Sequence, residues 1–413
     1  MRATETFPRA WPHESVVLVH DYLLVMRGAE RTFAAITDCF PHAPIATLLY
    51  DEFGTHGRFS GRAVTTSFLQ SVAADQRRFR HFLPVLPLAA ERLRLGDARV
   101  VVSSSSAFAH GVRPPPGAVH VCYCHSPLRY AWHEGERAEG EMPSWARPAG
   151  RAALAGVRRW DSRAARRVTA YIANSELTRR RIAEFYGREA AVVYPPVDVD
   201  RFSLEPDPRD AFLMVGEITR HKNVEVALAA AERAGVRIQV VGDGPDLARL
   251  RHRFPEAEFL GRITDEALIA RYARCRALVV TAVEEFGITM VEAQASGRPV
   301  VAAARGGATE IVQDGVTGVL FPPGDVDALA DRLANVDWEA FDPHTLRANA
   351  ERFSSGRFER RLKEEIAGAL ARAESATSHA VGDRPGARFA GAESGPDLDE
   401  GAGARRASPV PFS

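Results

Sequence analysis

The chain has 413 residues, of which 46% are hydrophobic and 26% charged, the composition of a globular protein with room for two or three domains. Its formal net charge is +0, so no general electrostatic attraction favours nucleic acid, and we expect no nucleic-acid partner. No apolar run reaches the roughly 18 residues of a membrane-spanning helix, and residues 1–14 lack the apolar segment of a secretory signal. These features predict a cytoplasmic protein.

Strands and helices alternate through the first half, which we interpret as one domain at residues 15–195 after a flexible stretch at 1–14. Short apolar runs predict strands at 16–20, 45–50, 99–103, 118–124 and 169–173. A helix is expected from Gly28, another at 145–167, and a third after Ser175 as its N-cap. The loop after the first strand has no G-x-G-x-x-G, which argues against a dinucleotide enzyme.

A second alternation of strands and helices begins after a linker at 196–208, where proline and acidic residues gather. We interpret residues 209–352 as a second domain, with strands at 212–217, 237–241, 258–260 and 317–321 and helices starting at Lys222, Asp325 and Pro343. Residues 353–371 predict a final long helix. Residues 372–413 hold few large apolar side chains, so we expect a disordered tail there.

Residues 279–305 carry the strongest signal. A strand ends at Val280, an acidic loop follows, a helix opens at residues 286–287, and Gly297 with Pro299 ends it before another strand. In parallel sheets ligands bind at the carboxyl ends of strands, beside helix N-termini, where free N–H groups hold phosphate. Glu284 and Glu292 flank that position, and carboxylates accept hydrogen bonds from sugar hydroxyls. The stretch therefore predicts a site for a phosphorylated polyhydroxyl ligand.

Glu284 and Glu292 are separated by seven residues, and EFGITMVEAQASGRPVVA resembles the E-x7-E segment of retaining glycosyltransferases of family 4. CYCHSPLRYAWH and HDYLLVMRGAERTF are similar to segments of the O-antigen and exopolysaccharide mannosyltransferases in that family. The resemblance extends over about residues 16–370. It implies an α/β protein with the GT-B fold, in which two Rossmann-like domains with parallel sheets face a cleft and the helix at 353–371 crosses back to the first domain.

The implied reaction is retaining transfer of a hexose, most simply mannose from GDP-mannose, to a lipid-linked or polysaccharide glycan. The second domain would bind the sugar nucleotide, which is a substrate and not a cofactor, and the first domain the acceptor. The family's mechanism uses no protein nucleophile, because cations and helix N-termini stabilise the leaving group. Two alternatives stay open: a sugar-nucleotide epimerase of the same fold, and a non-catalytic subunit of a glycan-synthesising complex.

The resemblance also implies roles for individual residues. The family's pyrophosphate-binding arginine is replaced by Glu217, an acid that cannot hold pyrophosphate, so we expect Arg220 to take its place beside Lys222. The residues expected to act in the reaction are His125, Glu284, Arg220 and Lys222. Those expected to line the donor site are Gly28, Glu217, Gly242, Arg262, Phe286, Gly287, Ile288, Thr289 and Glu292, and those for the acceptor are Asp21 and Arg129.

Two Asp-x-Asp sequences, 198–200 and 325–327, match a metal signature of another glycosyltransferase fold. One lies in the linker and the other opens a helix, so we interpret both as structural and expect no metal.

A lipid-linked acceptor would require the protein to reach a membrane surface. Basic residues in the first domain suggest a reversible attachment to anionic lipid at the inner face of the plasma membrane, although ordinary solvated arginines are an equal alternative. They are Arg77, Arg78, Arg80, His81, Arg151, Arg158, Arg159, Arg163, Arg166 and Arg167.

Overall fold

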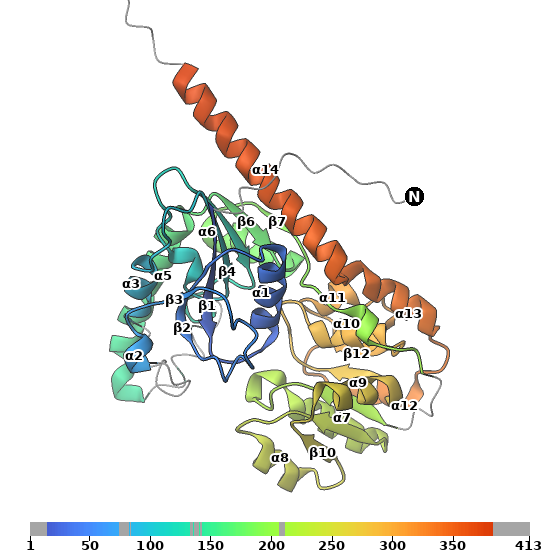
Figure 1. Ribbon diagram of the computed structural model, residues 1–413. Helices are drawn as coiled ribbons and strands as arrows, with labels where there is room; N and C mark the ends of the chain where they lie inside the picture. The colour runs from blue at the N-terminus through green and yellow to red at the C-terminus, as the bar shows by residue number, and fades with distance from the viewer. Residues whose placement is uncertain are drawn as a thin grey trace, which may run out of the picture. The chain divides into compact units, whose positions relative to one another are not determined.

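The computed structural model describes residues 15–73, 82, 84–132, 135, 140, 143–205 and 211–382. Within them the chain forms two sheets whose paired strands all run parallel, which confirms the predicted α/β class with two Rossmann-like domains. The first sheet has the order β3-β2-β1-β4-β5-β6-β7 and the second β10-β9-β8-β11-β12-β13 (Figure 1). Both sheets belong to one compact unit that ends at Ala373.

Among its described residues the first domain forms a sheet of seven strands, and helices cover both faces of that sheet. The strands are β1 Val16–Leu23, β2 Ile45–Tyr50, β3 Val64–Thr66, β4 Val100–Ser105, β5 Val119–Cys124, β6 Ala170–Ala173 and β7 Ala190–Val192. The helices are α1 Gly28–Cys39, α2 Gln70–Ala73, α3 Leu86–Glu91, α5 Arg147–Ala165 and α6 Glu176–Tyr186, with short turns η3 Ala109–Gly111, η4 Arg129–Ala131 and η5 Ser144–Ala146. The Ser175 hydroxyl accepts from the Thr178 N–H at 3.1 Å, which confirms the predicted N-cap of α6.

The second domain repeats the scheme with six strands: β8 Phe212–Val215, β9 Ile238–Val241, β10 Glu258–Gly261, β11 Leu278–Val280, β12 Val300–Ala303 and β13 Gly318–Phe321. Its helices are α7 Val224–Ala234, α8 Leu247–Arg253, α9 Asp265–Arg274, α10 Ile288–Ala295, α11 Ala308–Ile311, α12 Val326–Asn335 and α13 Pro343–Ala350, and its turns are η6 Val199–Arg201, η7 Arg220–Lys222 and η8 Glu351–Phe353. Asp325 accepts from the Ala328 N–H, so the second Asp-x-Asp sequence is a helix cap, as predicted.

Alternation along the strands decides which face each side chain covers. In β1, Val16 and Leu18 pack with α1 on one side of the sheet, whereas Val17 and Val19 pack with α3 on the other. Figure 1 shows α1 and α3 on opposite sides of these strands. Both faces are therefore apolar and buried, and only the strand ends are free to carry polar groups.

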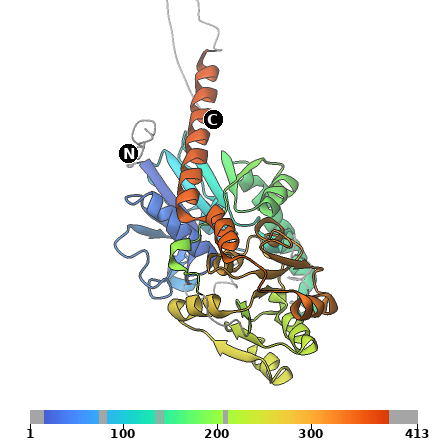
Figure 2. The ribbon, with the colours of Figure 1, turned by 90° about the vertical axis from the view of Figure 1, so that its right-hand side faces the viewer.

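The last helix, α14 Ser355–Gly382, returns to the first domain (Figure 2). Phe358, Leu362, Ile366 and Ala369 recur at helical spacing and share a core with Val16 and Leu18. The helix continues past Ala371, where we expected the chain to become disordered. Each residue added to an existing helix gains one hydrogen bond for the dihedrals of that residue alone, and residues 372–381 contain no proline or glycine. None of the described helices is long and apolar enough to cross a membrane.

Candidate functional site

The predicted donor residues gather at the carboxyl ends of β8 and β11. A small cavity lies there, lined by residues of both strands and of the loops that follow them. Glu217, Lys222, Glu284 and Thr289 belong to its lining. The site thus lies where ligands bind in open parallel sheets.

Lys222 and Glu284 form the central contact of this cavity. The Lys222 Nζ lies 2.5 Å from Oε1 of Glu284, and both side chains are 24% exposed. The turn that holds Lys222 is tied to β11, because the Thr281 hydroxyl contacts the carbonyl oxygens of Lys222 and Asn223 at 2.9 Å each. Asn223 itself adopts a left-handed φ of 51° between η7 and α7. In the described part of the chain, Oε2 of Glu284 has no hydrogen-bond donor, so it can accept one from a ligand.

Glu217 lines the same cavity, and Arg220 begins the turn η7 that ends at Lys222. The Arg220 guanidinium makes no ion pair or hydrogen bond with the described residues, and its side chain is exposed. Glu217 lies 3.5 Å from Arg27 of the loop before α1, and both side chains are about half exposed. An exposed pair of this kind contributes little stability, so Arg27 can leave it to contact a ligand.

Glu292, on the inward face of α10, is held by two groups that sequence reasoning did not anticipate. The Tyr272 hydroxyl donates to Oε2 of Glu292 at 2.8 Å, and Nη1 of Arg31 from the first domain lies 3.8 Å from Oε1. Burial raises the pKa of Glu292 above its ordinary value, while the Tyr272 and Arg31 contacts oppose that rise. Tyr272 is fully buried in α9, so it can orient Glu292 without meeting solvent.

The start of α10 brings main-chain groups to the site. Gly287, its N-cap, has a φ of 106°, and a Cβ there would lie 2.2 Å from the Met290 methyl carbon, so glycine is required at this position. The first N–H groups of an α-helix have no partner within the helix and are free for an anion. Gly28 faces this helix, because a Cβ built on it would lie 3.7 Å from Cδ1 of Ile288.

Three of the predicted donor residues do not line the cavity, and each has another structural surrounding. Phe286 is 4% exposed and packs on Tyr194 and Phe353, which makes its ring part of the core. Arg262 follows the edge strand β10, where it lies 3.8 Å from Asp243, outside the cavity. Gly242 permits a close approach, since its Cβ would lie 1.8 Å from the Gly216 carbonyl oxygen.

His125 follows β5 at the carboxyl end of the first sheet, as predicted, and it is 6% exposed. Its Nε2 lies 2.8 Å from Oγ of Ser104, and its main chain is held by Ser105 and Thr178. Burial, with smaller effects of His20 and Arg129, lowers the pKa of His125 from 6.5 to about 3. The imidazole is therefore neutral at physiological pH, which suits hydrogen bonding better than proton donation by an imidazolium.

The two predicted acceptor residues are engaged within the protein. Asp21 is 1% exposed and accepts from the N–H groups of Ser106, Ala107, Phe108 and Ala109 at 2.5 to 2.9 Å. Its carboxylate thus holds the loop after β4 with both oxygens, and the predicted contact with the acceptor stays a prediction. Arg129 lies 3.0 Å from Glu285, in the acidic loop of the second domain.

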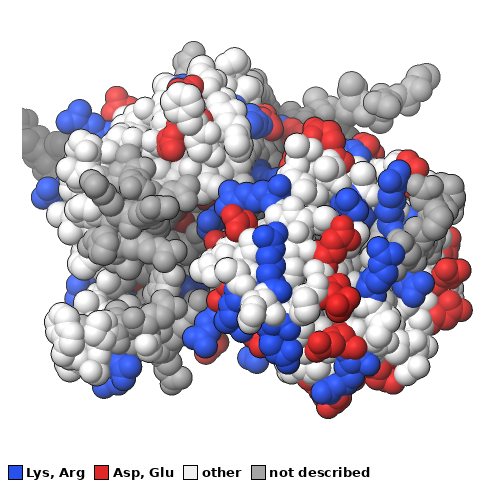
Figure 3. All heavy atoms as spheres, turned by 90° about the horizontal axis from the view of Figure 1, so that it is seen from below, with Lys and Arg blue, Asp and Glu red and all other residues white. Residues whose placement is uncertain are grey.

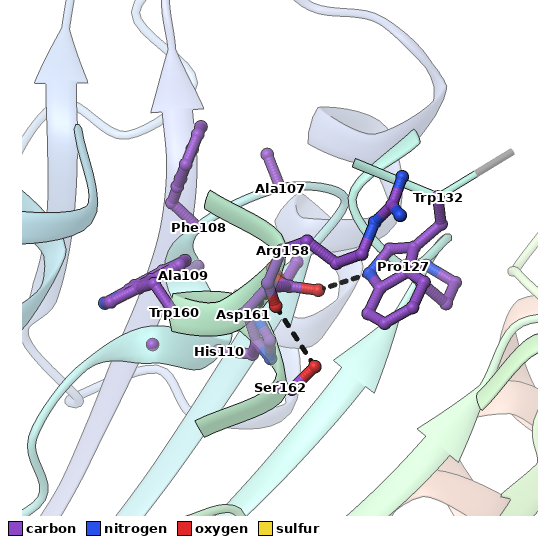
Figure 4. A network of polar contacts seen from close by, with 12 residues as sticks. Ala107, Phe108, Ala109, His110, Pro127, Trp132, Arg158, Trp160, Asp161 and Ser162 are labelled. Carbon is purple, nitrogen blue, oxygen red and sulfur yellow. Dashed lines mark hydrogen bonds and ion pairs between the residues drawn. The ribbon is translucent and has the colours of Figure 1, made fainter. Parts of the chain in front are cut away.

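A second buried network anchors the loop that carries Arg129 (Figure 4). Asp161 of α5 is fully buried and accepts from Nε1 of Trp132 at 2.7 Å, while its other oxygen lies 2.8 Å from Nε2 of His110. Arg158 lies over the Trp132 ring, with its Cζ 5.4 Å from the ring centre. Sequence reasoning missed Asp161, although an acid among apolar positions of an amphipathic helix was a usable signal.

On the face seen from below (Figure 3), charge does not single out another site. Basic and acidic side chains lie interspersed on the face shown in Figure 3, in agreement with the net charge of +0. Across the described ranges there is no group of three or more His, Cys, Asp or Glu side chains arranged to hold a metal ion.

Two family models match adjacent parts of the chain. One described as Glycosyltransferase Family 4 matches residues 26–201, and one described as Glycosyl transferases group 1 matches residues 198–352. His125 lies in the first match, and Lys222, Glu284 and Glu292 lie in the second. The chain belongs to glycosyltransferase family 4.

Curated relatives of this glycosyltransferase include two mannosyltransferases. The O-antigen chain mannosyltransferase C of Escherichia coli is 32% identical over 131 residues, which are 30% of this chain and 35% of the relative. The GDP-mannose-dependent alpha-mannosyltransferase of Mycobacterium tuberculosis is 33% identical over 153 residues, or 34% of this chain and 40% of the relative. The D-inositol 3-phosphate glycosyltransferase of Mycolicibacterium smegmatis is 34% identical over 194 residues, which are 40% of this chain and 44% of the relative. The glycosyltransferase thus matches less than half the length of each of these relatives.

Solved structures match over most of the glycosyltransferase. HepE of Anabaena, in complex with UDP-glucose, has a TM-score of 0.63 at 19% identity and covers 87% of this chain and 100% of its own. A glycosyltransferase from Rickettsia africae has a TM-score of 0.57 at 14% identity, and the match covers 86% of this chain and 98% of that structure. At these identities the likeness concerns the fold, and it agrees with the two parallel sheets: the fold is GT-B.

Proposed function

We propose that this glycosyltransferase is a retaining, metal-independent hexosyltransferase that transfers mannose from GDP-mannose to a glycan acceptor in cell-surface polysaccharide synthesis. The observation that carries the proposal is the Lys222–Glu284 pair in the cavity at the ends of β8 and β11, beside the start of α10. It puts a cation and a carboxylate with one unused oxygen at the position where a diphosphate and its sugar would meet.

The donor would be held by groups of complementary charge. Arg220, without a partner among the described residues, and Lys222 would bind the diphosphate, together with the first N–H groups of α10. Oε2 of Glu284 would accept a hydrogen bond from the transferred sugar. Glu292, oriented by the Tyr272 hydroxyl 2.8 Å away, would accept hydrogen bonds from the ribose.

In this proposal the protein supplies electrostatic stabilisation and not a nucleophile. The glycosidic bond to the diphosphate breaks, and negative charge develops on the leaving oxygen next to Arg220, Lys222 and α10. The acceptor hydroxyl would attack the anomeric carbon from the same face and pass its proton to the leaving phosphate oxygen, so that the anomeric configuration is retained. His125, neutral because burial lowers its pKa to about 3, would hydrogen-bond to the sugar without adding charge.

Mannose is the proposed sugar because two of the relatives are named as mannosyltransferases, one of them dependent on GDP-mannose. The glycan acceptor follows from the O-antigen chain named for the first relative. We propose that the acceptor binds the first domain, where Arg129 follows β5, and that a lipid-linked acceptor brings the protein to the inner face of the plasma membrane.

The experiment is incubation of the purified protein with GDP-mannose, GDP-fucose, UDP-glucose and UDP-N-acetylglucosamine, each with and without a polysaccharide or lipid-linked oligosaccharide extract. Freed nucleotide is measured, and the product is analysed by NMR for its anomeric configuration. We expect release of GDP from GDP-mannose that increases with acceptor, and an α-linked product from the α-linked donor. The Glu284→Gln protein serves as the control for contaminating activity.

Other outcomes would replace the proposal. Conversion of the donor to an epimer without acceptor would indicate the sugar-nucleotide epimerase. Absence of freed nucleotide and of nucleotide binding would indicate a non-catalytic subunit, for which the acidic Glu217 at the usual arginine position would be the cause. A β-linked product would reject the retaining mechanism, and release only from UDP-sugars would reject GDP-mannose as donor.

A further inference from the structure

Buried polar side chains connect His125 to the start of α1 across three neighbouring strands. The Ser104 hydroxyl lies 2.8 Å from Nε2 of His125 on one side and 3.1 Å from Nδ1 of His20 on the other. His20 and Ser104 are register partners of β1 and β4, and His125 follows β5. The parallel register therefore places two imidazoles and one hydroxyl in a row at the carboxyl ends of the strands.

The outer end of this row is an acid. Oε1 of Glu30, in the first turn of α1, lies 4.0 Å from Nε2 of His20, while its Oε2 accepts from the Arg27 N–H at 3.0 Å. The His20 ring is 1% exposed and stacks on Phe33 with ring centres 4.6 Å apart, so it cannot turn away. In the described part of the chain, the remaining nitrogen of the row, Nδ1 of His125, has no hydrogen-bond partner.

The protons of this row are coupled. A neutral imidazole has one N–H and one lone pair, and a serine hydroxyl has one hydrogen and two lone pairs. Ser104 could accept from both rings, but its own hydrogen would then have no acceptor in the row. Two arrangements use this hydrogen within the row. In the first, Ser104 donates to Nδ1 of His20 and accepts from Nε2–H of His125. In the second, both directions are reversed. A carboxylate 4.0 Å from Nε2 of His20 favours a proton on that nitrogen and therefore selects the first arrangement.

We propose that Glu30, His20 and Ser104 are positioning residues that hold His125 with its proton on Nε2, leaving Nδ1 as a hydrogen-bond acceptor for a hydroxyl of the bound sugar. The role toward the sugar rests on the proposed function, whereas the tautomer of His125 does not. The row moves no proton during the reaction: it fixes which nitrogen accepts.

The chain contains a matched comparison in the neighbouring serine. Ser103 of β4 lies 2.8 Å from Nε2 of His120, at the other end of β5 and on the opposite face of the sheet from Ser104. Ser103→Ala therefore removes one buried serine–histidine contact from the same strand without touching the row. Ser104→Ala removes the central member, and Ser104→Thr keeps the hydroxyl.

The test is long-range ¹H–¹⁵N NMR of the histidine side chains in the full chain at pH 7.5, without any sugar nucleotide. In the wild-type protein we expect the His125 resonances of a ring protonated at Nε2. In Ser104→Ala and in Glu30→Gln we expect a mixture of both tautomers, and in Ser103→Ala and Ser104→Thr the wild-type pattern. A His125 ring protonated at Nδ1 in the wild type, or one unchanged by Ser104→Ala, would overturn the proposal.

The second readout is steady-state kinetics with whichever sugar nucleotide reacts in the panel described under the proposed function. Ser104→Ala should lower kcat on the order of tenfold with little change in KM. This is the effect expected from losing one buried hydrogen bond, here the one that orients His125. Ser104→Thr should restore kcat. If Ser104 were merely structural, Ser104→Ala would lower Tm and leave the tautomer as it is. If no nucleotide sugar reacts at all, the NMR result still decides the tautomer, so failure of the proposed function is distinguishable.

Discussion

Lys222 Nζ and Glu284 Oε1 lie 2.5 Å apart, although the two residues are 62 positions apart in the sequence. The contact joins the turn after β8 to the loop after β11, the two central strands of the second sheet. Each partner limits the motion of the other, and each keeps further hydrogen-bonding capacity. The donor site that we propose is thus organised around one ion pair that is already formed before any ligand binds.

Replacing Glu284 by Gln keeps the size of the side chain and removes its charge. We expect a loss mainly in kcat, on the order of 10²-fold, because the carboxylate acts on the sugar as the bond to the diphosphate breaks. The measurement is steady-state kinetics with GDP-mannose. Glu225→Gln is the matched control, since Glu225 forms an exposed pair with Arg249 in the same domain at 2.8 Å and should behave as wild type. Unchanged kcat in Glu284→Gln would reject the assignment.

Tyr272 and Glu292 should affect binding of the nucleotide and not the chemical step. Glu292→Gln weakens the acceptor for the ribose hydroxyls, and Tyr272→Phe removes the donor 2.8 Å away that orients it. We expect each variant to raise Kd for GDP about tenfold, the value of one buried hydrogen bond, and the double variant to add little. Isothermal titration calorimetry measures all three. Fully additive effects would show that Tyr272 does not act through Glu292.

The donor site should work without a divalent cation. Arg220 and Lys222 can neutralise the diphosphate, and both Asp-x-Asp sequences have other uses: Asp325 caps α12, and Asp200 lies 3.2 Å from Arg347. We expect transfer in excess EDTA at the rate seen without it. The check is an activity assay before and after dialysis against EDTA. Complete loss that Mg²⁺ or Mn²⁺ restores would contradict metal independence.

Acid should destabilise the fold because two histidines are buried in neutral form. Burial lowers the pKa of His120 and of His125 from 6.5 to about 3. Between these values the unfolded chain binds more protons than the native one, so the free energy of unfolding falls as pH falls from about 6.5 toward 3 and is unaffected at higher pH. His120→Gln should remove about one of the protons taken up on unfolding in this pH range, which makes Tm depend less steeply on pH. The exposed His252→Gln should leave that dependence unchanged. Equal slopes in both would contradict this account.

Binding to anionic membranes is testable with the arginines of α5 and of the two residues that follow it. Arg158 and Arg167 are engaged with the Ala131 carbonyl and with Glu91, while Arg159, Arg163 and Arg166 are exposed. Of the other predicted basic residues, Arg151 is also exposed, whereas Arg77, Arg78, Arg80 and His81 lie outside the described residues. Basic side chains near an anionic leaflet contribute about 1 kcal/mol each, so Arg159→Ser, Arg163→Ser and Arg166→Ser together should release most of the bound protein.

The measurement is co-sedimentation with vesicles of anionic or neutral lipid at low and high salt. We expect binding to anionic vesicles only, weaker at high salt because ions screen the attraction. A control with the same charge change on exposed positions elsewhere, Arg233→Ser, Arg249→Ser and Arg361→Ser, should sediment like the wild type. Equal recovery with neutral vesicles would reject electrostatic attachment and favour a partner protein.

Local patterns in the sequence determined much of this protein. Apolar runs located the strands, and capping residues located helix starts, because both depend on neighbours within a few positions. The seven-residue spacing of Glu284 and Glu292 indicated glycosyltransferase family 4 for the same reason, because it lies within one loop and the helix that follows it. The last helix is the exception, since we expected it to end at residue 371 and the structure describes it as far as Gly382.

Contacts between distant strands were decided only by the tertiary structure. His20 and Ser104 are 84 residues apart, and nothing near either residue specifies that β1 pairs with β4 in the register that joins them. The same holds for the main-chain bonds of Asp21 and for the partners of Asp161 and Glu292. Parallel strands are joined by long crossovers, and their register is set by how the faces of the whole sheet pack against helices, a condition that involves the complete chain.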